Sequence, residues 1–191
     1  MVDIDKNDEE IASLVQSGKV DFFGILIERY EKKMERYARR ILNNQDDVKD
    51  VIQEIFIKAY INIKSFDASR KFSPWLYRIA HNEIVNVYRK NKRKSFLPIF
   101  DVDTFLPHII KEGELSIQKQ VDRREMKEII EKCLINLEEK YKEPIVLYYI
   151  EDLSYKEISD IMHLPISTVG VRIKRAKKIM KEIFKSQNYN G

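Results

Sequence analysis

Apolar residues recur at three- and four-residue steps along most of this chain, which is the period of an amphipathic helix. One such stretch runs from 22 to 42, and a second runs from 48 to 63. A third helix is expected to begin with Ser73 as its N-cap and Pro74 in the first helical position, and to end near Asn91. The chain holds five glycines and five prolines, too few for many hairpin turns, so the pattern predicts an all-α fold.

The helical pattern is interrupted between residues 95 and 119, where two prolines and a glycine stand in a stretch without a sustained period. We interpret 95–119 as a flexible linker. It would join two small helical domains, 1–94 and 120–191, each close to the lower size limit for a core of its own. In the second domain, helices are expected around 126–137 and from Pro144 onward.

The segment LSYKEISDIMHLPISTVGVRIKRAKKIM, which begins at Leu153, has the pattern of a helix-turn-helix. Ser154 and Glu157 are spaced as a capping box, and Ser167 is a candidate cap for the second helix. His163 stands in the turn, where a positive φ is needed, and histidine tolerates that conformation better than most residues. The second helix is basic, as a recognition helix in the major groove would be. An ordinary helical hairpin with a basic solvent face is the alternative.

Positive charge gathers in two parts of the chain, although the formal net charge is only +4. Residues 89–94 hold five lysines or arginines and no acid, and residues 172–185 hold seven with a single glutamate. A solvated charged face would explain either cluster alone. Two clusters beside recognisable motifs favour a nucleic-acid partner.

In their order, these motifs resemble the sigma-70 family, extracytoplasmic-function group, over nearly the whole chain. The segment DVKDVIQEIFIKAY, from Asp47, is similar to the helix with which the family binds core RNA polymerase. The segment SFDASRKFSPWLYRIAHNEIVNVYRK, from Ser65, is similar to its promoter-melting and downstream-element segment. The helix-turn-helix is similar to the domain that reads the upstream, minus-35 element. The resemblance assigns 1–94 to sigma region 2 and 120–191 to sigma region 4. It implies core RNA polymerase, promoter DNA and an anti-sigma factor as partners, and no cofactor.

The second predicted helix has a face that its apolar stripe does not bury. Aliphatic residues flanked by acids on that face suggest a docking surface, although a charged face with two stray aliphatics is the alternative. The resemblance adds that Asp50, Gln53 and Glu54 match positions with which the family binds the clamp helices of the largest polymerase subunits. The predicted polymerase-binding set is Asp50, Gln53, Glu54, Ile57 and Ile61.

Phe66 lies in a polar stretch between two predicted helices, where an aromatic ring could stack on an unpaired base for about 1–3 kcal/mol. Burial beneath the loop is the alternative. The resemblance assigns Phe66 and Asn82 to the pocket for an everted downstream-element base, whereas Trp75 is more typical of a core residue than of a wedge. The predicted downstream-element and melting set is Phe66, Trp75, Asn82, Arg89 and Lys90.

On the second helix of the helix-turn-helix, Lys174 and Arg175 are expected to read base edges, because arginine can pair with guanine. The family commonly has basic or polar residues at the positions of Gly170 and Val171. A glycine there predicts either close backbone approach to DNA or a weakened helix, and Val171 could touch a thymine methyl group. The predicted upstream-element set is Thr168, Gly170, Val171, Arg172, Lys174, Arg175, Lys177 and Lys178, of which Arg172, Lys177 and Lys178 are expected to hold phosphates.

Other function classes find little support. The polar, acidic N-terminus and the lack of a long apolar run predict a cytoplasmic protein without membrane insertion. Lone Cys133 and three histidines without paired spacing predict no metal site. We expect no catalytic residues and no enzyme activity, because a recombinase would need an assembled nucleophile or carboxylate site. A free-standing helix-turn-helix regulator is the main alternative, and it would normally dimerise on a palindrome.

Overall fold

The computed structural model describes residues 6–42, 44–91 and 137–188, and all regular elements in these ranges are helices. This confirms the all-α prediction. The chain divides into two compact units, Met1–Phe96 and Leu97–Gly191. The predicted linker lies outside the described residues, as does all but the last residue of the helix expected around 126–137. The predicted domain boundaries stay a prediction.

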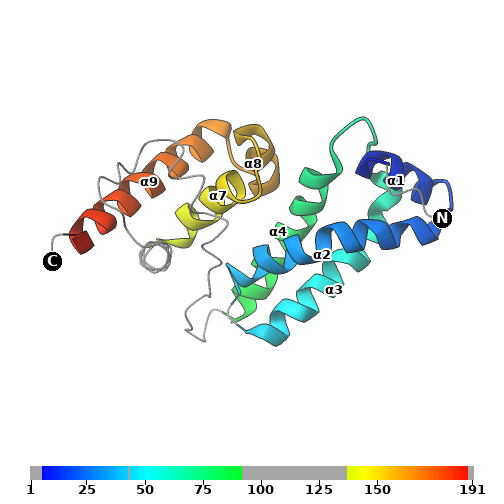
Figure 1. The fold of residues 1–191 in the computed structure, drawn as a ribbon, viewed down its shortest axis with the longest axis horizontal. Helices are drawn as coiled ribbons and strands as arrows, with labels where there is room; N and C mark the ends of the chain where they lie inside the picture. Colours follow the sequence, from blue (N-terminus) through cyan, green and yellow to red (C-terminus); the bar gives the residue numbers. More distant parts are fainter. Residues whose placement is uncertain (1–5, 43, 92–136, 189–191) are drawn as a thin grey trace. The chain divides into compact units, whose positions relative to one another are not determined.

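The first unit is a bundle in which α3 packs against both α2 and α4, while α1 closes one end (Figure 1). Its described elements are α1 (Asp8–Gln16), η1 (Val20–Phe22), α2 (Phe23–Arg39), α3 (Gln45–Asn62), η2 (Ile63–Ser65) and α4 (Phe72–Asn91). Aromatic edge-to-face pairs join these helices, with ring centroids 5.6 Å apart for Tyr30 and Phe72 and 5.5 Å apart for Tyr37 and Tyr77. Such pairs add about 0.5–1.5 kcal/mol each to the apolar burial of the core.

Helix α1 was not predicted, although a local signal for it exists. The Asn7 side chain accepts a hydrogen bond from the Glu10 amide at 2.8 Å, and the Glu10 carboxylate accepts one from the Asn7 amide at 2.9 Å. This is a capping box, and Ile11 and Ala12 behind it are fully buried. The helix is short, so its apolar period is less conspicuous than its cap.

Two predicted helix starts in these units are wrong by two residues. Helix α4 begins at Phe72, so Ser73 lies inside the first turn. The Phe72 amide donates to the Glu9 carboxylate at 2.7 Å, so a side chain from α1 satisfies one of the free amides at the start of α4. Ser167 likewise lies in the first turn of its helix, because the amide of Val169 already donates to the carbonyl of Pro165 at 3.1 Å.

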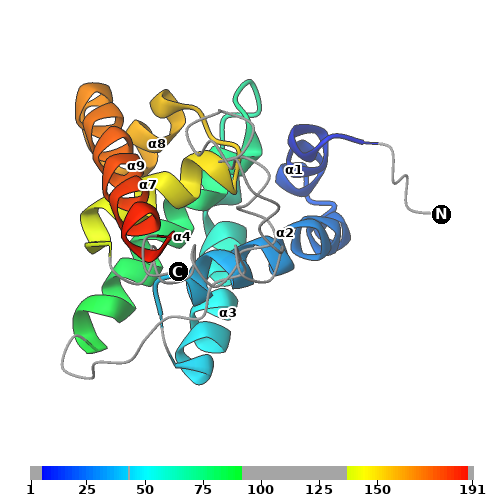
Figure 2. The same ribbon diagram turned by 60° about the vertical axis from the view of Figure 1, so that its left-hand side comes forward.

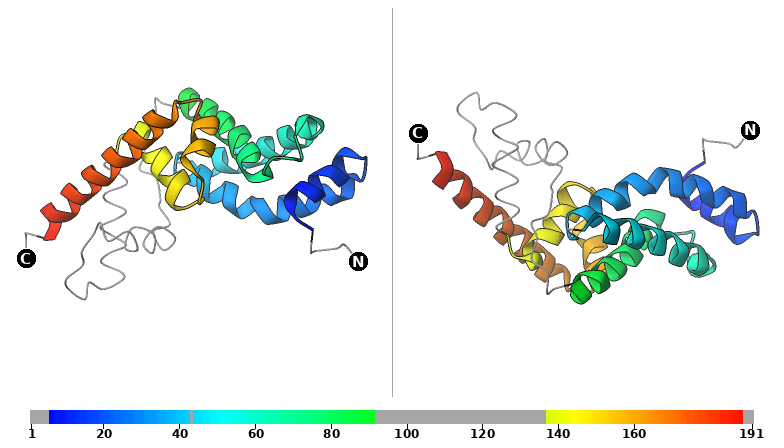
Figure 3. Two further views of the ribbon diagram at one scale, coloured as in Figure 1. Left: turned by 90° about the horizontal axis from the view of Figure 1, so that it is seen from above. Right: turned by 90° about the horizontal axis from the view of Figure 1, so that it is seen from below.

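The second unit consists, in its described part, of α7 (Glu139–Tyr149), α8 (Tyr155–Met162) and α9 (Ile166–Asn188). Helices α7 and α8 pack against the N-terminal part of α9, whose last turns extend beyond them (Figures 2 and 3). Among the α9 residues whose burial the structure describes, 166–183, the buried stripe consists of residues at helical spacing: Val169, Ile173, Ala176 and Met180.

The predicted start of α7 at Pro144 is also wrong, because the helix begins five residues earlier and contains the proline. Pro144 lacks the amide that would bond within the helix. Burial of Tyr141 and Ile145 on either side of it stabilises the helix despite this loss. Within the described ranges, no helix combines the length and hydropathy needed to cross a membrane.

Candidate functional site

The predicted polymerase-binding residues share one exposed face of α3, which we call the α3 face: Asp50, Gln53, Glu54, Ile57 and Ile61. Ile57 is 52% exposed and Ile61 is 69% exposed. The opposite side of the helix is the buried stripe, which fixes the direction of this face. The structure therefore places two exposed aliphatic side chains beside acids and an amide.

Residues next to the α3 face add to it in a way that the sequence did not predict. Tyr60 is exposed although it lies within the apolar stretch 48–63, and its ring packs edge-on against Phe23 with the ring centroids 5.2 Å apart. Glu54 lies 3.5 Å from Lys58, which also bonds Glu83 of α4 at 2.7 Å. The hydrogen bond to Glu83 raises the pKa of Lys58. This ion pair joins α3 to α4 behind the α3 face.

Phe66 is buried, with 5% of its surface exposed. Its ring centroid lies 5.4 Å from that of Phe72 and 5.3 Å from that of Trp75, so the three rings form one cluster. In this position the ring cannot stack on a base, and base capture would require Phe66 to leave the cluster. The stacking role stays a prediction.

Helix α1 binds both ends of the loop 66–71 between η2 and α4, which we call the Phe66 loop. The side-chain amide of Gln16 donates to the carbonyl of Ile63 at 2.8 Å and to the carbonyl of Phe66 at 2.7 Å. At the other end of the loop, Glu9 accepts the hydrogen bond from Phe72 described above. No prediction included these residues, because the partners are about fifty positions apart in the sequence.

The remaining downstream-element candidates lie along α4. Trp75, Asn82 and Arg89 follow at seven-residue intervals and therefore share one side of the helix. Trp75 is half-buried, whereas Asn82, Arg89 and Lys90 are exposed. The structure thus aligns an aromatic ring, an amide and a cation along one helix, with the second cation beside them.

The structure contains the helix-turn-helix, with the predicted capping box and the predicted positive φ in the turn. The hydroxyl of Ser154 accepts from the Glu157 amide at 3.3 Å, and the Glu157 carboxylate accepts from the Ser154 amide at 2.8 Å. His163 has φ 53° and ψ 45°, the left-handed conformation that ends α8. The turn is closed by Ser159, whose hydroxyl donates to the Leu164 carbonyl at 2.5 Å.

The upstream-element candidates occupy two sides of α9. One side, at three- and four-residue steps, carries Thr168, Val171, Arg172 and Arg175. The other side, at the same steps, carries Gly170, Lys174 and Lys177. Lys178 is exposed between them. A basic outer surface with an apolar residue near its start is therefore available to DNA.

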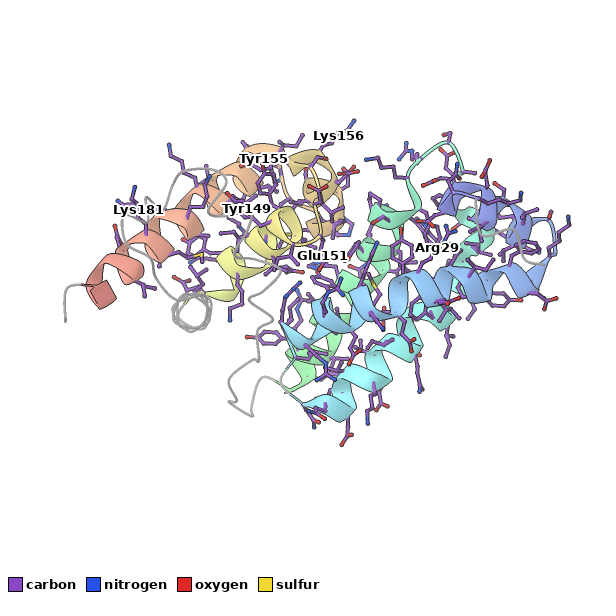
Figure 4. All side chains as sticks on the ribbon, in the orientation of Figure 1. Arg29, Tyr149, Glu151, Tyr155, Lys156 and Lys181 are labelled. Atoms are coloured by element: carbon purple, nitrogen blue, oxygen red, sulfur yellow. The ribbon has the colours of Figure 1, made fainter. Side chains whose placement is uncertain are left out.

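Gly170 faces a neighbouring ring. A Cβ atom at this position would lie 3.5 Å from Cε2 of Tyr155, an ordinary van der Waals distance. Tyr155 lies where α8 approaches α7 and α9, whereas Lys156 and Lys181 point outward (Figure 4). The ring of Tyr155 thus covers the position, and a direct role of Gly170 in DNA binding stays a prediction.

A cavity of about 370 Å³ lies between the start of α7 and the Arg175 side of α9. It is lined by Lys140, Tyr141, Ser167, Thr168, Val171, Arg172 and Arg175. Four of the predicted DNA-binding residues therefore meet two residues of α7 that were not predicted. The sequence alone did not predict this contact between α7 and α9, because Tyr141 and Arg175 are 34 positions apart.

Two family models match this chain in the same order as its two units. Sigma-70 region 2 matches residues 26–94, and Sigma-70, region 4 matches residues 127–180. Helix α1 lies outside both matches.

Relatives extend the match over most of the chain. The ECF RNA polymerase sigma factor SigW of Bacillus subtilis is 36% identical over 172 residues, which cover 88% of this chain and 91% of that protein. The ECF RNA polymerase sigma-E factor of Escherichia coli K12 is 34% identical over 176 residues, which cover 90% of this chain and 91% of that protein.

Solved structures share the fold. CnrH, in complex with the cytosolic domain of CnrY, superposes with a TM-score of 0.67 at 24% identity, covering 94% of this chain and 97% of that one. The sigma factor RpoE of Bartonella quintana, in complex with the anti-sigma factor NepR, has a TM-score of 0.64 at 21% identity, covering 85% and 96% of the two chains. From the family models and the relatives together, the chain belongs to the sigma-70 family, in the ECF group of RNA polymerase sigma factors.

Proposed function

We propose that this protein binds core RNA polymerase in the cytoplasm, directs it to specific promoters and helps to open the DNA there. The observation that carries this proposal is that one chain combines the α3 face with a helix-turn-helix whose outer surface is basic. The relatives that it matches over nine-tenths of their length are named RNA polymerase sigma factors. The protein acts by binding alone, without a catalytic residue of its own.

The α3 face docks on the polymerase. Burial of an exposed aliphatic side chain at an interface contributes about 25 cal/mol for each Å² removed from water. Ile57 and Ile61 supply this apolar area, and Asp50 and Glu54 supply charge that selects a basic partner surface. Tyr60, exposed beside them, extends the contact.

The second unit reads the upstream element. Lys174 and Arg175 contact base edges, Val171 touches a thymine methyl group, and cations on either side hold phosphates. A good arginine–guanine pair discriminates against the wrong base by about 1–3 kcal/mol. Thr168 and Val171, near the start of α9, enter the groove first.

The first unit opens the downstream element. Extrusion of one base costs a few kcal/mol, and stacking on an aromatic ring returns about 1–3 kcal/mol. Phe66 and Asn82 form the pocket for that base, with Arg89 and Lys90 beside the strand. Because Phe66 is buried in the free protein, capture of the base is coupled to a rearrangement of its loop.

An anti-sigma factor is the natural antagonist of these surfaces. The structures of CnrH and RpoE show those two proteins with CnrY and the anti-sigma factor NepR. An exposed docking face that is apolar in part would need to be covered when the protein is idle. We therefore include an anti-sigma factor among the partners.

A gel-shift comparison tests the proposal. The protein alone should bind promoter DNA weakly, because each unit carries a small basic footprint, and core polymerase should make binding tight and sequence-specific. A free-standing regulator would instead bind specifically as a dimer without polymerase. Specific binding by the protein alone, unchanged by core, would overturn the proposal.

A further inference from the structure

The cavity between α7 and α9 is positively charged. Among the described residues that line it, Lys140, Arg172 and Arg175 are cations, Tyr141, Ser167 and Thr168 carry hydroxyls, and none carries a carboxylate. Such a lining of donors suits an anionic oxygen, and three adjacent cations raise the local concentration of anions. The upstream-element side of α9 forms one wall, so an anion held here would lie next to the base-reading residues.

The Tyr141 hydroxyl contacts Arg175 directly. Nη1 of Arg175 donates to this hydroxyl at 3.2 Å. The Tyr141 side chain is held by the core, since only 7% of its surface is exposed, while Arg175 is exposed on α9. A guanidinium group has five N–H donors in a fixed fork, so one bond to a fixed hydroxyl restricts its direction and leaves the other donors available.

Lys140 stands beside this pair. Its Nζ lies 4.8 Å from the centroid of the Tyr141 ring and 2.5 Å from a carboxylate oxygen of Glu138. The hydrogen bond to Glu138 raises the pKa of Lys140. An exposed ion pair of this kind is weak, and the ammonium can exchange Glu138 for a phosphate at little cost.

We propose that the start of α7 is part of the DNA-binding surface: Tyr141 positions Arg175 for its base contact, and Lys140 holds a phosphate of the DNA backbone at the cavity together with Arg172. Tyr141 is a positioning residue, because it acts through Arg175. Lys140 is a phosphate-binding residue from a helix outside the helix-turn-helix. This inference rests on the proposed function, since it names how the same surface reads the upstream element.

Tyr141→Phe tests the positioning role, because it removes the hydroxyl and keeps the buried ring. Holoenzyme formed from the full chain and core polymerase would be used to select promoters with a randomised upstream element. We expect the preference at one base pair to fall about three- to tenfold, the worth of one hydrogen bond, with other positions unchanged. Tyr148→Phe, a hydroxyl deletion elsewhere on α7, is the matched control and should leave every preference intact.

The double variant shows whether Tyr141 acts through Arg175. Arg175→Ala should abolish preference at the same base pair, and adding Tyr141→Phe should then change it by less than about twofold. A full effect of Tyr141→Phe in the Arg175→Ala protein, or no effect in the wild type, would overturn the positioning role. If wild-type holoenzyme itself enriches no upstream element, the proposed function fails first, and the inference fails with it.

Lys140→Gln tests the phosphate contact through its salt dependence. We expect weaker binding to all sequences alike, and a slope of log affinity against log salt that is smaller by about one. Lys181→Gln, at an outward-pointing lysine far along α9 (Figure 4), is the control for a lost charge and should change the slope by less than half as much. Equal slopes in the two variants would show that Lys140 has no special place at the DNA.

Discussion

The structure changes how Gly170 of the recognition helix is interpreted. A glycine in the recognition helix predicted either close backbone approach to DNA or a weakened helix. The position faces the ring of Tyr155 at a distance that a methyl group tolerates, which favours the weakened helix. Glycine costs about 0.5–1 kcal/mol relative to alanine inside a helix.

Gly170→Ala should therefore raise the free energy of unfolding by about 0.5–1 kcal/mol, as measured by urea denaturation of the full protein. Gly24→Ala on α2 is the control, because a Cβ there meets no atom within 4 Å and gains propensity only. Stabilisation by Gly24→Ala alone would mean that the Tyr155 ring cannot accept the added methyl group.

Phe66 combines a structural role with the proposed opening role, and the two must be separated. Phe66→Ala would cost about 3–5 kcal/mol by leaving a cavity in the aromatic cluster, so loss of activity would be uninformative. Phe66→Leu keeps most of the apolar volume and removes the flat ring.

With holoenzyme, Phe66→Leu should lower the permanganate reactivity of promoter thymines several-fold, while closed-complex formation changes little. Phe72→Leu, a substitution in the same cluster, controls for weakened packing. Thymines as reactive as with wild type would make Phe66 a core residue only.

At the scale of elements, α1 ties the Phe66 loop to the rest of the first unit. Gln16→Leu would leave the carbonyls of Ile63 and Phe66 without their donor. We expect the free energy of unfolding to fall by about 1–2 kcal/mol, since the site is partly buried. Urea denaturation checks this, with exposed Gln45→Leu as the control. An equal loss in both variants would show that the Gln16 bonds contribute nothing.

Helix starts show where sequence reasoning reaches its limit. The apolar period located α2 and α3, and the capping box of Ser154 was readable because cap and helix are local. The start of α4 could not be predicted from the local sequence, because its first amide binds Glu9 of α1, which is distant in the chain. The predicted start of α7 at Pro144 was wrong for a similar reason, because burial of the neighbouring residues outweighs the local cost of a proline within the helix.

The candidate sites were likewise predictable only where they depend on a single helix. Every residue of the α3 face is exposed, because a helix with one buried stripe leaves a predictable outer side. The burial of Phe66 and the meeting of Tyr141 with Arg175 depend on contacts between segments far apart in the chain. Periodicity within one helix carries no information about such contacts.

At the scale of the whole molecule, the account requires two surfaces with different partners in one chain. The net charge of +4 is too small for tight binding to DNA without help, so the polymerase must contribute to promoter binding. Neither unit is expected to act alone. The α3 face is therefore the feature on which the whole function depends.

The most direct test measures, by titration, how tightly the full protein binds core RNA polymerase. Wild type is compared with a double variant that carries Asp50→Lys and Glu54→Lys. The double variant of Glu28 and Glu31 to lysine, which changes the charge equally on exposed α2 positions, is the control. We expect the α3 variant to bind core at least about tenfold more weakly, with helical circular dichroism unchanged, and the α2 variant to bind as wild type does. Undiminished binding by the α3 variant would contradict the account.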